Sequence, residues 1–272
     1  MWRDAKYLIA YIAPISAYFA VYQGGIWSYS AIYVAFILIP LIELNSPSST
    51  YNYTTEEERG RLSNYFFDFI LYANIPILYG LITFYFLTLK AGGLASYEIT
   101  GMTLSVGLVV GSIGINVAHE LGHRVNKMEQ NLSKLLLLSG LYMHFFIEHN
   151  RGHHKYVATP EDPATSRKGE ILYFFWFRSV INSYLHAWKL ENERLRRAGQ
   201  SIFSWNNEMI RFQLIQVAYL LVMGTLFGWN LLPYAVAIAV VGFLLLESVN
   251  YIEHYGLMRK QLPSGRYEAV QP

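Results

Sequence analysis

The densest group of metal-binding side chains is a histidine cluster in the middle of the chain. Histidines stand at positions 149, 153 and 154, in the stretch EHNRGHH (148–154). In a helix, His149 and His153 lie one turn apart on one face, about 6 Å along the axis. His154 follows directly, so this turn can supply ligands to one metal ion or to two neighbouring ions. Neutral imidazole suits iron, copper, nickel and zinc. A polar loop after a helix end is the other interpretation, but three imidazoles within six residues favour a metal site.

A second pair of histidines follows an apolar run. His119 and His123 are one turn apart in HELGH (119–123), and Asn116 lies on nearly the same face, where its side chain could hold an imidazole from behind. Taken alone, this is the HExxH pattern of zinc proteases, with Glu120 as general base. The pair therefore indicates a metal site but leaves the metal open.

A third group ends the last apolar run. Glu247, Asn250 and His254 follow each other at spacings i, i+3 and i+7, which is one stripe of a helix. A carboxylate so deep in an apolar run is costly and usually functional. Its simplest use is to accept an imidazole N–H and fix the tautomer of a metal-bound histidine. We therefore expect His254 to be a ligand and the other two to support the site.

The remaining histidines do not share this pattern. His144 and His186 stand alone, and we expect both to be packed or interfacial residues. The six clustered imidazoles exceed the three protein ligands of one catalytic zinc. They indicate two metal ions with open positions, and all-nitrogen ligation of this kind suits iron that binds O₂.

The composition indicates a membrane protein with an apolar substrate. Hydrophobic residues make up 53% of the 272 residues, aromatic residues 16% and charged residues only 15%. The net charge of +2 is too small to indicate a nucleic-acid partner. Cysteine is absent, which excludes disulfides, thiolate metal sites and a cysteine nucleophile.

Six apolar runs predict an all-α, polytopic membrane protein forming one unit over residues 1–272. A span needs about 20 such residues. The predicted spans are 7–22, 27–44, 65–89 (with Pro76 as a kink), 99–118, 212–227 and 232–249. The other segments are predicted to be a surface loop (45–64), a buried or re-entrant helix (132–146), an interfacial amphipathic helix (173–188) and a water-exposed charged segment (189–211).

The charges predict the orientation of these spans. With six spans, both ends of the chain, residues 45–64 and residues 119–211 share one side of the membrane. That side holds every lysine and arginine except Lys90. The positive-inside rule places it in the cytoplasm, together with the histidine groups.

These motifs resemble the membrane-bound, non-haem diiron alkane 1-monooxygenases. HELGH (119–123) is similar to the first histidine box of that family, and EHNRGHH, continuing through VATPEDPATS (157–166), is similar to its second. NYIEHYGL (250–257) is similar to a family signature with an extra ligand histidine. The resemblance covers essentially the whole chain.

The resemblance implies a site, a reaction and partners. The implied ligands of two non-haem iron ions are His119, His123, His149, His153, His154 and His254. The implied reaction oxidises the terminal methyl group of n-alkanes to a primary alcohol with O₂ as co-substrate. The implied electron donors are rubredoxin and rubredoxin reductase, and the implied location is the bacterial inner membrane.

One departure from the family pattern concerns the end of the chain. The family has a third box of three more histidines beyond the Glu-His-Tyr-Gly motif, whereas this sequence stops at RYEAVQP (266–272). We therefore expect the chain to be the N-terminal portion of a longer protein, truncated before the third box. One iron site would then be under-coordinated.

Three alternatives remain open. A fatty-acyl desaturase or hydroxylase of the same superfamily shares the metals but not NYIEHYGL. An intramembrane zinc protease would use His119, Glu120 and His123, but it leaves the second cluster and His254 unexplained, and the sequence has no Leu-Asp-Gly segment for a third ligand. A transporter comes last, because the histidines stand at helix ends and not at the bilayer midplane.

Two further predictions concern substrate and partner. Ala31 and Ala35 form a small-residue stripe that serves either close helix packing or an apolar tunnel measuring alkane length. The resemblance favours the tunnel, with Ala35 where a bulky residue would block it. The exposed cations expected to dock an acidic rubredoxin are Arg151, Lys155, Arg167 and Lys168.

Overall fold

The structure, a computed structural model, describes residues 2–46 and 64–269. Within these ranges the regular elements are helices, apart from one isolated antiparallel bridge between Gln261 and Tyr267. The all-α prediction is therefore confirmed. Most of the surface loop predicted over residues 45–64 lies outside the described residues.

Five helical stretches are long and apolar enough to cross a membrane. They are Gly25–Asn45, Tyr65–Ala91, Ser96–Gly122, Glu208–Phe227 and Trp229–His254. They match the second to sixth predicted spans, and the chain is a multi-pass membrane protein.

The first predicted span, residues 7–22, differs from the others. It begins as a 3-10 helix, η1 (Trp2–Tyr11), and continues as α1 (Ile12–Gln23). η1 and α1 together cover Trp2–Gln23, but this stretch is not among the five that are long and apolar enough to cross a membrane. The count of six spans is therefore approximate. The ends of the spans that carry the histidines still share one side of the membrane. This follows from the alternating directions of the five other spans and does not depend on residues 7–22.

The first of the five spans is one continuous helix with changes of winding. It consists of η2 (Gly25–Tyr29), α2 (Ser30–Tyr33), the π-helical η3 (Val34–Leu38) and α3 (Ile39–Asn45). The second span is α5 (Tyr65–Ala91), where Asn64 caps the start by accepting a hydrogen bond from the backbone N–H of Phe66 at 3.0 Å. Pro76 lies inside this helix, as predicted.

The most buried span carries the first histidine pair. It runs through α6 (Ser96–Val109), the π-helical η4 (Val110–Ile115) and α7 (Asn116–Gly122). It packs closely against α13 (Leu232–His254): a Cβ atom on Gly111 would lie 2.7 Å from the carbonyl oxygen of Gly242. Glycine at this crossing lets two backbones meet, and this holds the α7 end of one helix near the α13 end that carries His254.

The second histidine cluster lies on a short helical segment. After α8 (Lys127–Ser139), the chain turns through Leu141, whose φ is +49°, and continues as α9 (Phe145–Glu148), the π-helical η5 (His149–His153) and α10 (His154–Tyr156). The prediction of one helix over residues 132–146 is therefore wrong. These residues belong to two helices with a turn between them.

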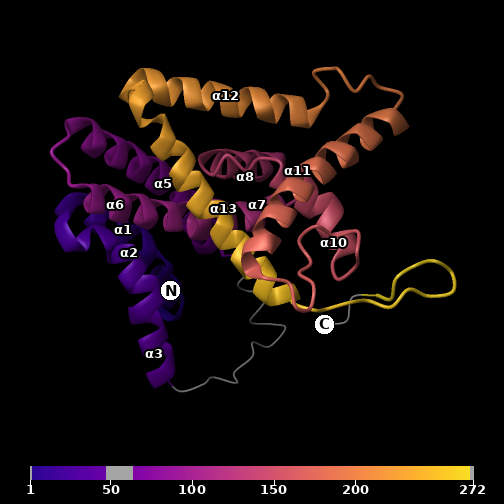
Figure 1. Cartoon of the computed structure of the whole chain (residues 1–272), viewed down its shortest axis with the longest axis horizontal. Helices are drawn as coiled ribbons and strands as arrows, with labels where there is room; N and C mark the ends of the chain where they lie inside the picture. The colour runs from indigo at the N-terminus through magenta and orange to yellow at the C-terminus, as the bar shows by residue number, and fades with distance from the viewer. Residues whose placement is uncertain (1, 47–63, 270–272) are drawn as a thin grey trace.

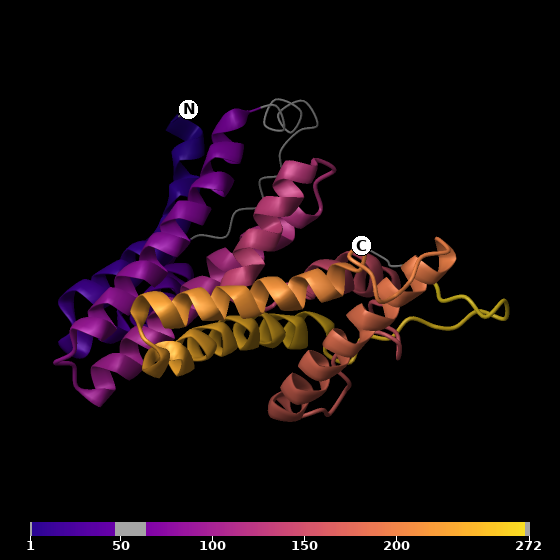
Figure 2. The same ribbon diagram turned by 90° about the horizontal axis from the view of Figure 1, so that it is seen from above.

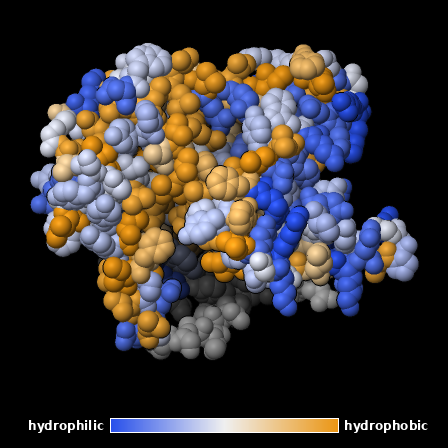
Figure 3. Space-filling view, viewed as in Figure 1, coloured by the Kyte–Doolittle hydropathy of each residue, from blue (hydrophilic) through white to orange (hydrophobic). Residues whose placement is uncertain are grey.

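The last helices form a layer over this segment (Figures 1 and 2). α12 (Glu208–Phe227) and α13 are joined through η6 (Trp229–Leu231) and diverge from it in Figure 1, while α11 (Leu172–Arg197) runs between their far ends at an angle to both. α11 is one helix, although the prediction divided it at residue 188 into an interfacial and a water-exposed part. Hydrophobic residues spread over the helices in Figure 3, and hydrophilic ones gather where α11 meets α12 and along the C-terminal segment.

Candidate metal centre

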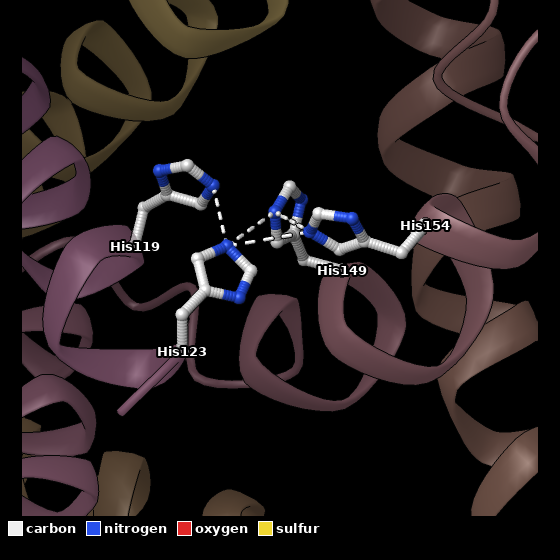
Figure 4. Close-up of side chains that lie close together, drawn as sticks. All are labelled: His119, His123, His149 and His154. Carbon is white, nitrogen blue, oxygen red and sulfur yellow. Dashed lines mark hydrogen bonds between the residues drawn. The ribbon is translucent and has the colours of Figure 1, made fainter. Parts of the chain in front are cut away.

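Four histidines from two helices point their rings at one place (Figure 4). His119 and His123 come from the end of α7, and His149 and His154 from η5 and α10. One ring nitrogen from each lies within 4.8 Å of those of the other three. The Nε2 atoms of His119 and His123 are 2.8 Å apart, and those of His149 and His154 are 3.0 Å apart. Nε2 of His123 joins the pairs, at 3.3 Å from each atom of the second pair.

The winding of η5 decides which histidines of the second cluster meet. In an α-helix, residues four apart share a face, and His149 was therefore expected to pair with His153. η5 is π-helical, and a π turn brings residues five apart together. His149 consequently meets His154, and His153 is left to another side of the segment.

This cluster fits a metal ion. Nitrogen ligands about 2.0–2.1 Å from one ion stand about 2.9–3.4 Å apart at tetrahedral to octahedral angles, close to the observed spacings. Burial and the neighbouring imidazoles lower the pKa of His149 well below its usual value. Burial and the charges of His123 and His153 also lower the pKa of His154. Both rings are thus held neutral, the state that binds metal.

His153 and His254 form a second group beside the first. Their ring centroids are 4.9 Å apart, and the ring of His153 stacks on that of His149 at 5.2 Å. The six predicted ligand residues therefore lie together, as four converging rings and one adjacent pair.

Asp162 orients His153 and was not singled out from the sequence. Its buried Oδ2 lies 3.0 Å from Nδ1 of His153, and it also accepts hydrogen bonds from Thr165 Oγ1 at 2.5 Å and, through Oδ1, from the backbone N–H of Ala164 at 3.1 Å. Burial alone would lower the pKa of His153, but the Asp162 carboxylate outweighs burial and raises it. A proton kept on Nδ1 leaves Nε2 as the atom that can bind metal. The only signal in the sequence was the place of Asp162 in the stretch after the second cluster.

The residues predicted to support the site lie differently from expectation. The imidazole expected to donate to Glu247 is replaced by the hydroxyl of Tyr142, which donates to Oε1 at 2.9 Å. Glu247 and Asn250 nevertheless line a closed cavity of about 10 Å³ together with His149 and His153, with room for about one water molecule. Asn116 is exposed, and no described hydrogen bond joins it to an imidazole.

His144 and His186 lie outside the converging group. His144 is buried against the rings of Tyr142 and Tyr184, at 4.3 and 5.3 Å, and burial lowers its pKa to about 3. Nδ1 of His186 lies 3.1 Å from Oε1 of Glu148, the residue before His149. His186 thus contacts the second cluster from α11, although its isolation in the sequence did not indicate this.

A charge network anchors the second cluster from behind. The guanidinium of Arg151 donates to Glu191 of α11 at 2.8 Å and to Glu208 of α12 at 2.7 Å. Glu191 is completely buried and also takes two hydrogen bonds from Arg194, at 2.7 and 2.8 Å. Lys134 of α8 completes the network, 2.8 Å from Glu208. Four elements are thus tied together at a residue that stands between two candidate ligands.

This network changes the predicted docking surface. Arg151 was expected to face a redox partner, but its guanidinium is used within the fold. The other three cations of that prediction, Lys155, Arg167 and Lys168, are exposed.

The two alanines predicted to line a tunnel have different surroundings. Ala31 is buried in the core, on the helix α2 that packs against α6, whereas Ala35 is half-buried in η3. An apolar groove of about 490 Å³ runs along the same helix, but it is lined by other residues, among them Val34 and Ile37.

Comparison with known families identifies the chain. Residues 96–271 match the fatty acid desaturase family, a stretch that begins at α6 and includes all six clustered histidines. The chain belongs to this family. The zinc-protease alternative, which needs only His119 and His123 of these six, therefore loses its support.

Several curated relatives of this desaturase-family chain have names that describe hydrocarbon oxidation. It is 37% identical over 259 residues to alkane 1-monooxygenase 2 of Pseudomonas aeruginosa, covering 90% of this chain and 66% of the relative. It is 35% identical over 267 residues to alkane 1-monooxygenase 1 of Alcanivorax borkumensis, covering 95% and 64%. It is 26% identical to the hydroxylase component of a xylene/toluene monooxygenase of Pseudomonas putida, covering 93% and 68%. The chain thus spans about two thirds of the length of these relatives.

Proposed function

We propose that this desaturase-family protein hydroxylates the terminal methyl group of n-alkanes to give primary alcohols. The observation that carries the proposal is the convergence of four imidazoles on one point, with His153 and His254 directly beside them. The names of the alkane 1-monooxygenase relatives support the substrate class. The single membrane-embedded unit predicted over residues 1–272 would carry this site.

The metals in this proposal are two non-haem iron ions. His119, His123, His149 and His154 would hold one ion, and His153 with His254 would give two ligands to the other. When bound, the irons supply O₂ activation. The overall reaction balances as RH + O₂ + 2 e⁻ + 2 H⁺ → ROH + H₂O, so two electrons and two protons must be delivered for each alcohol formed.

The residues of this chain would prepare the site for that reaction. Asp162 holds the proton of His153 on Nδ1 and so presents Nε2. Phe145 stacks on His149 at 4.8 Å and shields the cluster on one side from water. Glu247 and Asn250 line the closed cavity and would orient the ligand histidines through a hydrogen-bonded water molecule. Asn116 could hydrogen-bond to an imidazole only after its side chain changes rotamer.

The electron donors in the proposal are rubredoxin and rubredoxin reductase. The histidine-bearing ends of the spans would face the cytoplasm across a bacterial inner membrane, because nearly all cations lie on that side. Lys155, Arg167 and Lys168 are exposed there and would attract an acidic donor.

A fatty-acyl desaturase or hydroxylase is the second candidate, favoured by the description of the matching family. The two functions share the metals but differ in product. An alkane hydroxylase converts an alkane lacking any polar group into an alcohol, whereas a desaturase introduces a double bond into an acyl chain.

The test reconstitutes the full-length protein with rubredoxin, its reductase and NADH. Iron and zinc are measured per polypeptide, and products are followed from n-alkanes and from acyl substrates in parallel. We expect about two irons and a primary alcohol. Zinc in place of iron, or an unsaturated acyl product with alkanes untouched, would overturn the proposal.

A further inference from the structure

α11 is a long helix that joins the same-side ends of two membrane spans. Near its start, Tyr251 of α13 donates a hydrogen bond to the carbonyl of Glu170 at 2.6 Å, and Trp176 donates to Ser248 at 3.2 Å. Near its end, Glu191 accepts a hydrogen bond from the backbone N–H of Glu208 at 2.8 Å.

These two attachments fix the direction of α11. α12 begins at Glu208, and α12 and α13 are joined at their other ends through η6, so the start of α12 and the end of α13 lie on the same side of the membrane. A helix tied to both of these ends stays on that side and does not cross the bilayer; in Figures 1 and 2 it runs obliquely to α12 and α13. Consistently, α11 is not among the five helical stretches that could span a membrane.

One side of α11 exposes large apolar side chains. Its members recur at helical spacing and are between 55% and 71% exposed: Phe174, Phe177, Ile181 and Leu185. We call these four residues the α11 stripe. The side that packs into the protein is mixed, and its buried residues are Phe175, Ser179, Ser183, Ala187, Glu191 and Leu195. A helix whose outer side faced water would not expose four large apolar side chains, because exposed apolar surface is unfavourable in water.

The α11 stripe ends in positive charge. One turn beyond Leu185, the exposed residue is Lys189. One turn further, Glu193 is ion-paired with Arg197 at 3.3 Å, and Arg196 beside them is exposed. Apolar side chains followed by cations match the boundary between acyl chains and anionic phospholipid headgroups. This charge complementarity favours a lipid surface over an apolar protein partner.

The neighbouring side of the same helix is polar. Asn182, directly after Ile181, is also exposed and lines a pocket of about 280 Å³ with Arg167 and Lys189. Leu185 lines the same pocket and therefore stands at the border between the stripe and the polar side. Consecutive residues are about 100° apart around a helix, so two sides of α11 at the same level have different surroundings. Lipid against the stripe and water in the pocket would give each of these two sides of α11 a surrounding that suits its side chains.

We infer that α11 lies in the plane of the membrane surface, with the α11 stripe in the acyl-chain boundary of the bilayer and Asn182 facing water. The inward side of the helix carries Ser183, which lines the cavity beside His149 and His153. The candidate metal centre therefore lies at the depth of the bilayer surface, where a molecule dissolved in lipid can reach it without crossing bulk water.

The absence of cysteine from the chain allows a direct test. Single-cysteine variants Phe177→Cys, Ile181→Cys, Leu185→Cys, Asn182→Cys and Lys189→Cys carry a nitroxide label in vesicles of phosphatidylethanolamine and phosphatidylglycerol. Collision with O₂, which concentrates in lipid, is compared with collision with a water-soluble nickel chelate. We expect the O₂-to-nickel ratio to be several-fold higher at 177 and 181 than at 182 and 189, with an intermediate value at 185, the border position.

The pair of adjacent positions 181 and 182 is the matched control, because the two labels share the same helix turn. Strong nickel access at 177 and 181 would place the stripe in water and overturn the inference. Exclusion of both reagents there would mean that a second copy or another protein covers the stripe, which also overturns it. Neither result depends on enzymatic activity. A wrong placement of α11 can therefore be told apart from a wrong assignment of the proposed hydroxylation.

Discussion

Nδ1 of His153 lies 3.0 Å from Oδ2 of Asp162, a carboxylate oxygen that the fold buries completely. The ring is thereby fixed in one orientation and in one tautomer, with Nε2 as its ligand atom. Partners of this kind, next to a metal ligand, typically change metal affinity or activity by about 10- to 100-fold when removed.

Asp162→Asn should therefore weaken metal retention, because an amide does not stabilise the proton on Nδ1 as a carboxylate does. We expect a loss of iron affinity of about 10- to 100-fold, measured as iron per polypeptide during titration with a chelator. Glu161→Gln is the control, because Glu161 is exposed and adjacent in sequence. Equal iron retention in the two variants would contradict the role of Asp162.

Arg151→Ala should loosen the second histidine cluster. Removing the guanidinium leaves Glu191 and Glu208 short of a cation, and breaking a buried ion pair costs about 3 kcal/mol of unfolding free energy. Arg194→Ala removes a cation from the same Glu191 but leaves the residue between His149 and His153 in place. We expect both variants to melt at lower temperature and only Arg151→Ala to lose iron. Equal iron loss would mean that the network stabilises the fold without positioning the cluster.

The stability of the protein should fall in acid through Glu191. Burial raises the pKa of this carboxyl, but hydrogen bonds from Arg194, the backbone N–H of Glu208 and Arg151 outweigh burial and lower it from 4.5 to about 2. A lowered pKa contributes stability above the unfolded value, and that stability is lost as the pH falls from 4.5 towards 2.

The melting temperature of Glu191→Gln should accordingly lie below that of the wild type near neutral pH, and the two should approach each other in that acid range. Glu193→Gln, which removes an ion pair with the exposed Arg197, should change the unfolding free energy by less than about 0.5 kcal/mol. A difference between wild type and Glu191→Gln that stays constant with pH would argue against the shift.

Gly152→Ala should disturb the contact between Glu148 and His186. A Cβ at this position would lie 2.7 Å from Oε1 of Glu148 and 2.9 Å from Cε1 of His186. We expect a loss of about 1–3 kcal/mol from overpacking, read as a lower melting temperature, together with reduced iron content. Gly140→Ala is the control, since its Cβ would meet nothing nearer than 3.5 Å. Two variants with the same stability and iron content would show that the segment adapts without cost.

Ala35→Trp should shift the preferred substrate to shorter alkanes, if Ala35 faces the path of the hydrocarbon in the proposed reaction. The control is Ile37→Trp, on the same helix but lining the outer groove. Product profiles over a series of alkane lengths, at equal iron content, distinguish the two. An unchanged profile for Ala35→Trp would assign this residue to helix packing, the role that the buried position of Ala31 already suits.

The sequence by itself determined the helical membrane class and the residues that could bind metal. Apolar runs of span length leave helices as the simplest fold, because backbone groups in lipid must bond within their own segment. The histidines at 119 and 123, and the group from 149 to 154, stand out because imidazoles cluster there at helical spacing in a chain without cysteine. The stripe of Glu247, Asn250 and His254 added His254 to them, and the family resemblance implied the same ligand.

Only the tertiary structure decided which histidines meet. If the second cluster were α-helical, His149 would pair with His153, whereas η5 is π-helical and pairs His149 with His154. The winding is set by contacts from distant segments: Arg151 is tied to α11 and α12, and Gly152 lies against His186. The same holds for Asp162, which reaches His153, and for Tyr142, which takes the place of an imidazole at Glu247. Such contacts join residues up to 105 positions apart, so no local pattern of the chain could specify them.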